Sequence, residues 1–349
     1  MRKVFSAIIA VTGLVSLTVS NIGLGQDKTL HFFNWSEYMD PNIIKGFEQK
    51  YSVKVQQSFY ESDDDMLAKV EQGGTQLYDL VVPSTAIATV MRRKNLLMRL
   101  DQSLIPNLKN LSSRFRTLES DPGNRYAVPY QWGSMGIAYR KDLLPNPDRT
   151  WGLFFDPKKQ PGPFVMLEVP HETIGAALKY LGRSLNSRNK EDLKLVLPLL
   201  EGAAKRSLGF DGASAIGTKL QGKQAVIGMN YSGNILRVIE ENKNIGFFIP
   251  KEGSELFVDT IAIPSGAPNS ALAHKFINYL LEAKVGAQLS NYNRYGTPNE
   301  AALPLINAAD RKNPILYPGP NEMKKLELIG DLGAAQPFYD SVWTKIKSH

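Results

Sequence analysis

The sequence predicts an α/β protein of two lobes, each a doubly wound sheet with flanking helices. Strand-like runs alternate with helical runs from Thr29 onward, a pattern typical of a mainly parallel sheet. The chain has 349 residues, of which 43% are hydrophobic and 21% charged, enough for two cores. Extended runs over residues 126–144 and 255–269 then predict crossings between the lobes, as in a hinge that closes on a ligand.

Residues 1–25 are expected to form a cleavable signal peptide outside the fold. Arg2 and Lys3 precede an apolar run, and Gly23 and Gly25 are small residues suited to cleavage. A transmembrane anchor is the alternative, but the run is short for a bilayer, which needs about 20 residues. The chain has no cysteine for lipid attachment or disulfides, so the expectation is a soluble protein of the periplasm.

The N-terminal half begins with strand-to-helix units. Residues 29–35 read as a short strand, and Asp40 caps the next helix with Pro41 at its first position. Residues 53–60 alternate like a second strand, and Ser62 opens a helix whose three aspartates suit the helix dipole. A calcium site is the alternative for these aspartates, but the spacing and glycine of an EF-hand loop are missing.

Polar and aromatic side chains follow two strands of this half. Trp35 to Tyr38 come directly after the first strand, and Ser84-Thr85 follow the buried run "YDLVV". Ligands of doubly wound sheets bind beyond the carboxyl ends of the strands. These side chains are therefore predicted to line a ligand cleft.

The second half supplies the other lobe. Its expected elements are a strand in "GPFVMLEVP", a helix after His171-Glu172, the helix "EDLKLVLPLLEGAAKR" and the strand-turn "QAVIGMNYSGN". After the return crossing, a single helix is expected over residues 270–290, and the tail from Tyr317 returns to the second lobe. The predicted boundaries are 26–133 with 260–314 for the first lobe, and 134–259 with 315–349 for the second.

Motifs for chemistry are missing from the sequence. The histidines lack metal-ligand spacing, no Gly-x-Ser-x-Gly elbow or phosphate-binding loop occurs, and no cofactor or metal is expected. His171 beside Glu172 could form half of an acid/base pair, although a solvated or capping histidine is the commoner case. The net charge of +7 comes from scattered basic residues, which argues against nucleic-acid binding. The sequence favours binding over catalysis.

Several segments together resemble one known family. "FFNWSEYMDPNIIKGFEQKYSVKVQQSFYESDDDMLAKV", "YDLVVPSTAIATVMRR", "AVPYQWGSMGIAY", "FVDTIAIPSGAPN", "RYGTPNEAALPL" and "DLGAAQPFYDSVWTKIK" are similar, in order and spacing, to the periplasmic spermidine/putrescine-binding proteins of polyamine ABC importers. The resemblance runs from about Thr29 to Lys347. It implies a type II periplasmic-binding-protein fold, a polyamine ligand and a membrane permease as partner, with a monomer as the default.

The resemblance also implies an aromatic box for the methylene chain and carboxylates for the ammonium groups. The implied contacts are Trp35, Ser36, Tyr38, Ser84, Glu172, Tyr231, Phe257, Asp259 and Tyr295. An aromatic face attracts a cation by roughly 0.5–2 kcal/mol, and a buried ammonium needs a charged partner. Asp259, in the apolar run "LFVDTIAIP", is the implied central carboxylate, and Glu37 is a candidate for a more distant, water-mediated charge.

Each implied contact has a simpler structural interpretation. Trp35 and Tyr38 could be core aromatics, Ser84 could cap its helix, and Glu172 could be a first-turn carboxylate on a helix dipole. Asp259 is harder to explain in this way, because a carboxylate among apolar residues needs a partner.

The chain departs from the family at several of the matched positions. Spermidine-preferring members have a second aspartate where this chain has Val169, and Glu168 is one step away, on the opposite face of an extended segment. A tyrosine of some members is Ala86 here, a late glutamine is Ile329, and the box tryptophans are Tyr231 and Phe257. These changes leave the preferred polyamine open.

Two other functions remain as alternatives. The helix that begins after Ser84 favours anions at its N-terminus, so an amino acid or oxyanion could be the solute. Against this, the matched positions supply carboxylates and no arginine fork. An exported α/β enzyme is the second alternative, and it lacks a catalytic constellation.

Overall fold

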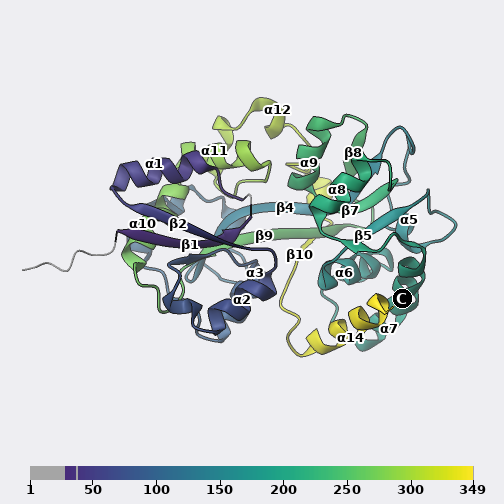
Figure 1. Ribbon diagram of the computed structural model, residues 1–349, viewed down its shortest axis with the longest axis horizontal. Coiled ribbons are helices and arrows are strands. Elements are labelled where there is room, and N and C mark those ends of the chain that lie inside the picture. Colours follow the sequence, from purple (N-terminus) through teal and green to yellow (C-terminus); the bar gives the residue numbers. More distant parts are fainter. Residues whose placement is uncertain (1–27, 37, 349) are drawn as a thin grey trace, which may run out of the picture.

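The computed structural model describes residues 28–36 and 38–348, so the predicted signal peptide and Glu37 lie outside the described residues. Two lobes stand side by side, and strands β4, β9 and β10 run between them (Figure 1). Their bounds are Ala127–Arg140 for β4, Ser254–Ala262 for β9 and Leu326–Leu328 for β10. Within the described residues, no helix combines the length and the apolar character needed to cross a membrane.

The first lobe contains the N-terminal strands and the helices that cover them. Its strands are β1 (Thr29–Trp35), β2 (Lys54–Tyr60) and β3 (Leu80–Val81). Its helices are α1 (Pro41–Tyr51), α2 (Asp63–Glu71), α3 (Thr85–Arg93), α4 (Ser113–Arg116), α10 (Ser270–Leu280), α11 (Ala283–Asn293) and α12 (Ala308–Arg311). The predicted caps are confirmed: Asp40, Ser62 and Ser84 each accept a backbone N–H of the helix that follows.

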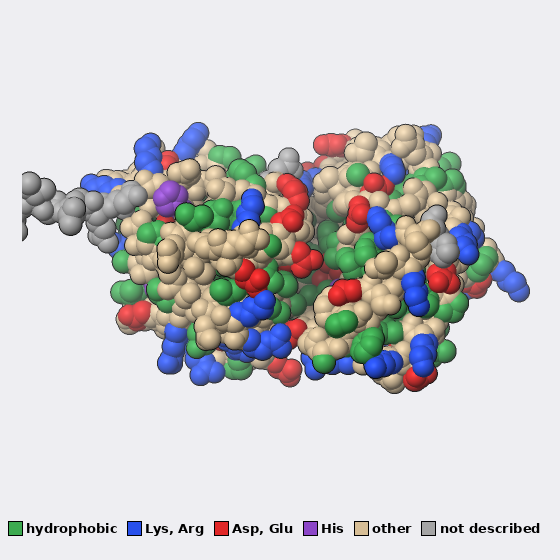
Figure 2. Space-filling model, turned by 60° about the horizontal axis from the view of Figure 1, so that its bottom comes forward, with side chains coloured by type: hydrophobic (Ala, Val, Ile, Leu, Met, Phe, Trp, Pro, Cys, Tyr) green, Lys and Arg blue, Asp and Glu red, His purple; other side chains and the backbone are tan. Residues whose placement is uncertain are grey.

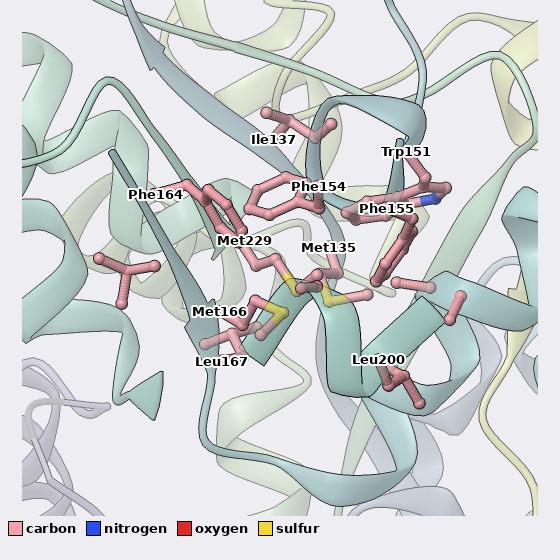
Figure 3. Packing of buried hydrophobic residues seen from close by; sticks show 14 of the residues in the cluster. Met135, Ile137, Trp151, Phe154, Phe155, Phe164, Met166, Leu167, Leu200 and Met229 are labelled. Atoms are coloured by element: carbon pink, nitrogen blue, oxygen red, sulfur yellow. The ribbon is translucent and has the colours of Figure 1, made fainter. Parts of the chain in front are cut away.

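The second lobe is built around one large apolar cluster. Its strands are β5 (Phe164–Leu167), β6 (Phe210–Asp211), β7 (Ile227–Tyr231) and β8 (Ile245–Phe248). The remaining helices are α5 (Gly152–Phe155), α6 (Pro170–Tyr180), α7 (Lys190–Arg206), α8 (Ala213–Gln221), α9 (Ser232–Glu241), α13 (Pro320–Met323) and α14 (Gln336–Lys347). Buried aromatic rings and methionines from β4, α5, β5 and β7 fill the centre of this cluster (Figure 3). Because α14 packs on α6 and α7, the C-terminal helix belongs to this core.

The sheet is mixed rather than mainly parallel. Its main strand order is β2-β1-β3-β9-β4-β7-β5-β6. The outer pairs β1–β2, β1–β3, β5–β6 and β5–β7 are parallel, as predicted for each lobe. The two long central strands, β4 and β9, pair antiparallel with each other and with their neighbours β7 and β3. A chain that crosses between the lobes and later returns must run in both directions, which accounts for the antiparallel centre.

The single helix expected over residues 270–290 is two helices, α10 and α11. The backbone is extended at Glu282, and Leu281 is the C-cap that ends α10. The carbonyl of Leu281 accepts hydrogen bonds from the side-chain amides of Asn110 and Asn299, at 2.9 and 2.8 Å. Tertiary hydrogen bonds thus replace helical ones at the break, and the apolar pattern alone does not reveal them.

Candidate functional site

The candidate site lies on one face of β9, where the two lobes meet. Side chains of a strand alternate between its faces, so Glu255, Phe257 and Asp259 share a face. Asp259 contacts a residue of the first lobe and Phe257 a residue of the second. A groove separates the lobes on the face drawn in Figure 2, and acidic side chains gather along its sides.

On the first-lobe side, Tyr38 contacts three other segments of the chain. Its hydroxyl donates to Oδ2 of Asp259 at 2.6 Å, and its ring lies edge-on to Tyr295 with centroids 5.3 Å apart. Its backbone carbonyl accepts the hydroxyl of Tyr130 at 2.9 Å. The segment after β1 is therefore anchored to β4, and the phenol of Tyr38 is aimed at the Asp259 carboxylate.

On the second-lobe side, Tyr231 and Glu172 form a similar pair. The Tyr231 hydroxyl, at the end of β7, donates to Oε2 of Glu172 at 2.5 Å. Phe257 lies edge-on to Tyr231 at 5.5 Å and to Tyr295 at 5.7 Å. A continuous row of rings therefore runs from Tyr38 through Tyr295 and Phe257 to Tyr231, with one carboxylate at each end.

The other predicted first-lobe residues lie apart from this row. The Trp35 indole packs on Tyr60 and donates to the carbonyl of Val82 at 3.0 Å. Ser36 is exposed, and its hydroxyl donates to Glu61 at 2.6 Å. Ser84 caps α3, as its simpler interpretation predicted, while its backbone forms an isolated bridge with Asp259. The structure thus brings together six of the nine predicted residues and leaves Trp35, Ser36 and the Ser84 side chain at the margin.

The carboxylates of the site are set in surroundings that disfavour their charged forms. Burial raises the pKa of Asp259 to about 7, although the hydrogen bond from Tyr38 partly offsets the rise. Burial also raises the pKa of Glu172, and the charge of Asp259 adds to the increase. Among the described residues, neither carboxylate has an ion pair with lysine or arginine. A positively charged ligand would stabilise both in their ionised form.

Two further acidic residues of the site were not predicted. Glu255 is 2% exposed, so Asp259 is not the only buried acid of β9. Asp63, interpreted above as a first-turn helix residue, accepts the backbone N–H of Ser84 at 3.3 Å, and burial raises its pKa to about 6. The two-residue spacing of 255, 257 and 259 was the available signal for Glu255. The run of three aspartates gave no signal that distinguishes Asp63.

The positions that depart from the family lie around the second-lobe end. Ile329 lines a narrow pocket with Glu172 and Glu255. Val169 is half-buried at the start of α6, whereas Glu168 is exposed and paired with Lys347 on the surface, so it does not replace the missing aspartate. His171 turns to α14, where its ring lies edge-on to Tyr339, and burial lowers its pKa to about 4. It is half-buried and does not cap α6, whose N-cap is Val169.

The arrangement suits an elongated cation. Rings supply apolar faces that attract positive charge, and the carboxylates at the ends supply acceptors for ammonium groups. Within the described part of the chain, no group of three or more potential ligands is arranged for a metal ion. The rings and carboxylates together offer contacts that suit a charged organic solute.

The fold and this interlobe site define a two-lobed solute-binding protein of the periplasmic type. The chain belongs to the bacterial extracellular solute-binding protein family, whose profile matches residues 42–315. It is 34% identical to the putrescine-binding periplasmic protein SpuD of Pseudomonas aeruginosa, over 100% of this chain and 99% of that protein. It is 30% identical to the spermidine/putrescine-binding periplasmic protein of Escherichia coli, over 99% of both chains.

Solved structures agree with this assignment. A putative spermidine/putrescine ABC transporter protein from Listeria monocytogenes superposes with a TM-score of 0.85 at 34% identity, covering 92% of this chain and 99% of that one. The TpPotD lipoprotein of Treponema pallidum superposes with a TM-score of 0.83 at 31% identity, covering 92% of this chain and 100% of that one. The type II periplasmic-binding-protein fold implied by the sequence is therefore confirmed.

Proposed function

We propose that this protein captures a polyamine between its lobes and delivers it to the permease of an ABC importer. The observation that carries the proposal is the row of aromatic rings with Asp259 at one end and Glu172 at the other. An aliphatic chain lies well against such rings, and its ammonium groups pair with the terminal carboxylates. The full-length relatives whose names refer to putrescine and spermidine support the same solute class.

The protein acts as a binding protein without catalysis in this proposal. The hinge strands β4 and β9 allow the lobes to close on the solute, and the closed form is the one that a permease recognises. Export by residues 1–25 places it outside the cytoplasm, and a monomer is the form we propose for this shuttle.

An anionic solute is the alternative that the experiment must exclude. Two features would serve an anion: the N-terminus of α3 behind Ser84, and Arg237 in α9. Burial raises the pKa of Tyr295 to about 12, and the positive charge of Arg237 partly offsets this rise, which places that charge near the site. Glutamate is therefore the informative control ligand.

Thermal unfolding of the protein without its signal peptide tests the proposal directly. The ligands are putrescine, cadaverine, spermidine, spermine and arginine, with glutamate as the anionic control. A solute that binds only the folded state raises the melting temperature by mass action. Stabilisation by one or more polyamines supports the proposal, whereas stabilisation by glutamate alone, or by none of the ligands, contradicts it.

A further inference from the structure

Glu255 is a buried acid whose role the matched family positions do not assign. Its side chain is 2% exposed, and its Oε2 atom has no hydrogen-bond partner among the described residues. Burying an ionised carboxylate costs several kcal/mol unless a positive charge or hydrogen-bond donors compensate. On β9, Leu256 and Phe257 are apolar, and the hydroxyl of the adjacent Ser254 makes no hydrogen bond among the described residues, so the strand itself does not provide that compensation. The group is therefore poised for a partner that comes from outside the chain.

Glu255 shares its surroundings with the second-lobe carboxylate of the site. Glu172, Glu255 and Ile329 line one narrow pocket. Burial, followed by the charges of Glu172 and Asp259, raises the pKa of Glu255 well above its usual value. Burial raises the pKa of Tyr231, and the negative charges of Glu172 and Glu255 raise it further. Both glutamates therefore lie close enough to Tyr231 to act on its hydroxyl. Glu255 thus faces the end of the ring row where Tyr231 and Glu172 meet.

The lysine on this pocket is already paired. The Nζ atom of Lys179 lies 2.7 Å from Oε1 of Glu327, and the side chain of Lys179 is only 12% exposed. Glu327 occupies the position of β10 that pairs with Glu255 of β9. Because Lys179 is paired with Glu327, its charge does not neutralise Glu172 and Glu255. The pocket therefore carries a net negative charge whenever either of these two glutamates is ionised.

The position of Glu255 along β9 sets a length scale for the ligand. Glu255 and Asp259 are four residues apart on one face, which separates their Cα atoms by about 13 Å at about 3.3 Å per residue. With single bonds of about 1.5 Å in a zigzag chain, the nitrogens of a four-methylene diamine lie about 6 Å apart. The terminal nitrogens of a triamine with three- and four-methylene arms lie about 11 Å apart. The length of the triamine is close to the Cα separation of these two acidic residues, whereas the diamine spans about half of it.

We propose that Glu255 is a ligand-contacting carboxylate that, together with Glu172, binds the distal ammonium group of a long polyamine, so that the site prefers a triamine to a diamine. The inference rests on the proposed function, since it assumes a polyamine solute. Glu255 supplies a charged acceptor in the pocket where Ile329 offers an apolar side chain. The distal end of the site is therefore polar through Glu255 of β9, although Ile329, which follows β10, is apolar.

The test compares Glu255→Gln with the unmodified protein by calorimetric titration of spermidine and putrescine. The matched control is Glu191→Gln, which removes the same charge from an exposed position on α7. We expect Glu255→Gln to weaken spermidine binding by about tenfold or more, the effect of losing a charged hydrogen bond, and putrescine binding by less than about threefold. Equal weakening for both amines, or no weakening for either, would overturn the proposal.

A second measurement needs no variant and covers the case in which Glu255→Gln fails to fold. Titrations of the unmodified protein in two buffers of different ionisation enthalpy give the number of protons released on binding. Spermidine should release more protons than putrescine near pH 7, because its distal ammonium requires Glu255 in its ionised form. Equal release rejects the role of Glu255 while leaving the proposed function intact. Absence of binding by any polyamine rejects the proposed function itself.

Discussion

The hydroxyl of Tyr38 donates to the carboxylate of Asp259 at 2.6 Å, although the two residues are 221 positions apart in the sequence. This hydrogen bond occupies one oxygen of a buried acid and leaves the carboxylate without an ion pair among the described residues. It also fixes the segment after β1 against the crossing strand β9. The same contact therefore orients the acid and ties the segment after β1 to a strand that crosses between the lobes.

Replacing Asp259 with asparagine should weaken polyamine binding by well over about tenfold, because the buried ammonium then loses its charge partner. Asparagine keeps the size of the side chain and can still accept the Tyr38 hydroxyl. Calorimetric titration measures the effect. Asp340→Asn, an exposed position on α14, provides the control for loss of one charge. An unchanged dissociation constant for Asp259→Asn would remove this residue from the site.

Polyamine affinity should increase as the pH rises from about 6 to 8. The pKa of Asp259 is raised to about 7, and that of Glu172 is raised in the same direction, so both carboxyls retain protons at the lower pH. A bound ammonium favours the ionised carboxylates and therefore releases those protons. Titration at several pH values provides the measurement. A polyamine affinity that falls over this range would contradict the pairing of these carboxylates with the ammonium groups.

The ligand-free protein should become less stable as the pH rises from about 6.5 to 8. Burial raises the folded-state pKa of Asp259 from 3.8 to about 7 and also raises the pKa values of Glu172 and Glu255, so the folded state retains protons that the unfolded state has lost until the pH passes these raised values. Stability therefore falls with increasing pH, by up to about 1.4 kcal/mol per pH unit for each retained proton. His171 has a lowered pKa, so the stability that its neutral form contributes is lost only as the pH falls below about 6.5. His171 therefore has little effect on stability between about pH 6.5 and 8.

Urea unfolding at each pH measures this trend. Asp259→Asn and Glu255→Gln should each flatten the pH dependence, because each removes a group that is protonated in the folded state. Asp340→Asn should leave the slope unchanged. If both site variants retain the full slope, other titrating groups are responsible and the buried acids are not linked to folding in this way.

Local structure was well predicted because local physics determines it. The first strand ends at Trp35 as expected, and Asp40, Ser62 and Ser84 cap their helices through contacts two or three residues away. The contacts among Tyr38, Asp259, Tyr231 and Glu172 depended on a resemblance, since nothing in the local sequence brings such distant residues together. The resemblance in turn could not indicate Glu255, which matches no assigned family contact.

Glu255 and the break at Leu281 depend on tertiary contacts. A glutamate at the start of a strand is usually exposed, and here it is buried where β10 pairs with β9 some seventy residues later in the chain. Leu281 lies in a continuous apolar pattern, and the helix ends there because Asn110 and Asn299 satisfy its carbonyl. The pairing of β10 with β9 leaves no periodic pattern in the sequence around Glu255, and the hydrogen bonds to Leu281 leave none in the sequence of residues 270–290.

Two ion pairs join the lobes on either side of the site, and removing both should favour a more open form. Arg93 at the end of α3 lies 2.6 Å from Asp331, which follows β10, and Arg294 after α11 pairs with Glu240 of α9. These side chains are partly exposed, so each pair contributes roughly 0.2–1 kcal/mol to closure, and salt screens it.

The double variant Arg93→Gln with Glu240→Gln removes one partner from each bridge and leaves the pair of Arg294 with Asp310 in place. We expect a larger ligand-free radius of gyration by small-angle scattering and a polyamine affinity about three- to tenfold lower at low salt. The difference in affinity should shrink in high salt, because screening weakens the bridges of the unmodified protein. Lys194→Gln, which breaks an exposed ion pair within α7, serves as the control. An unchanged radius together with an unchanged affinity would show that packing along β4 and β9, and not these charges, determines the position of the lobes.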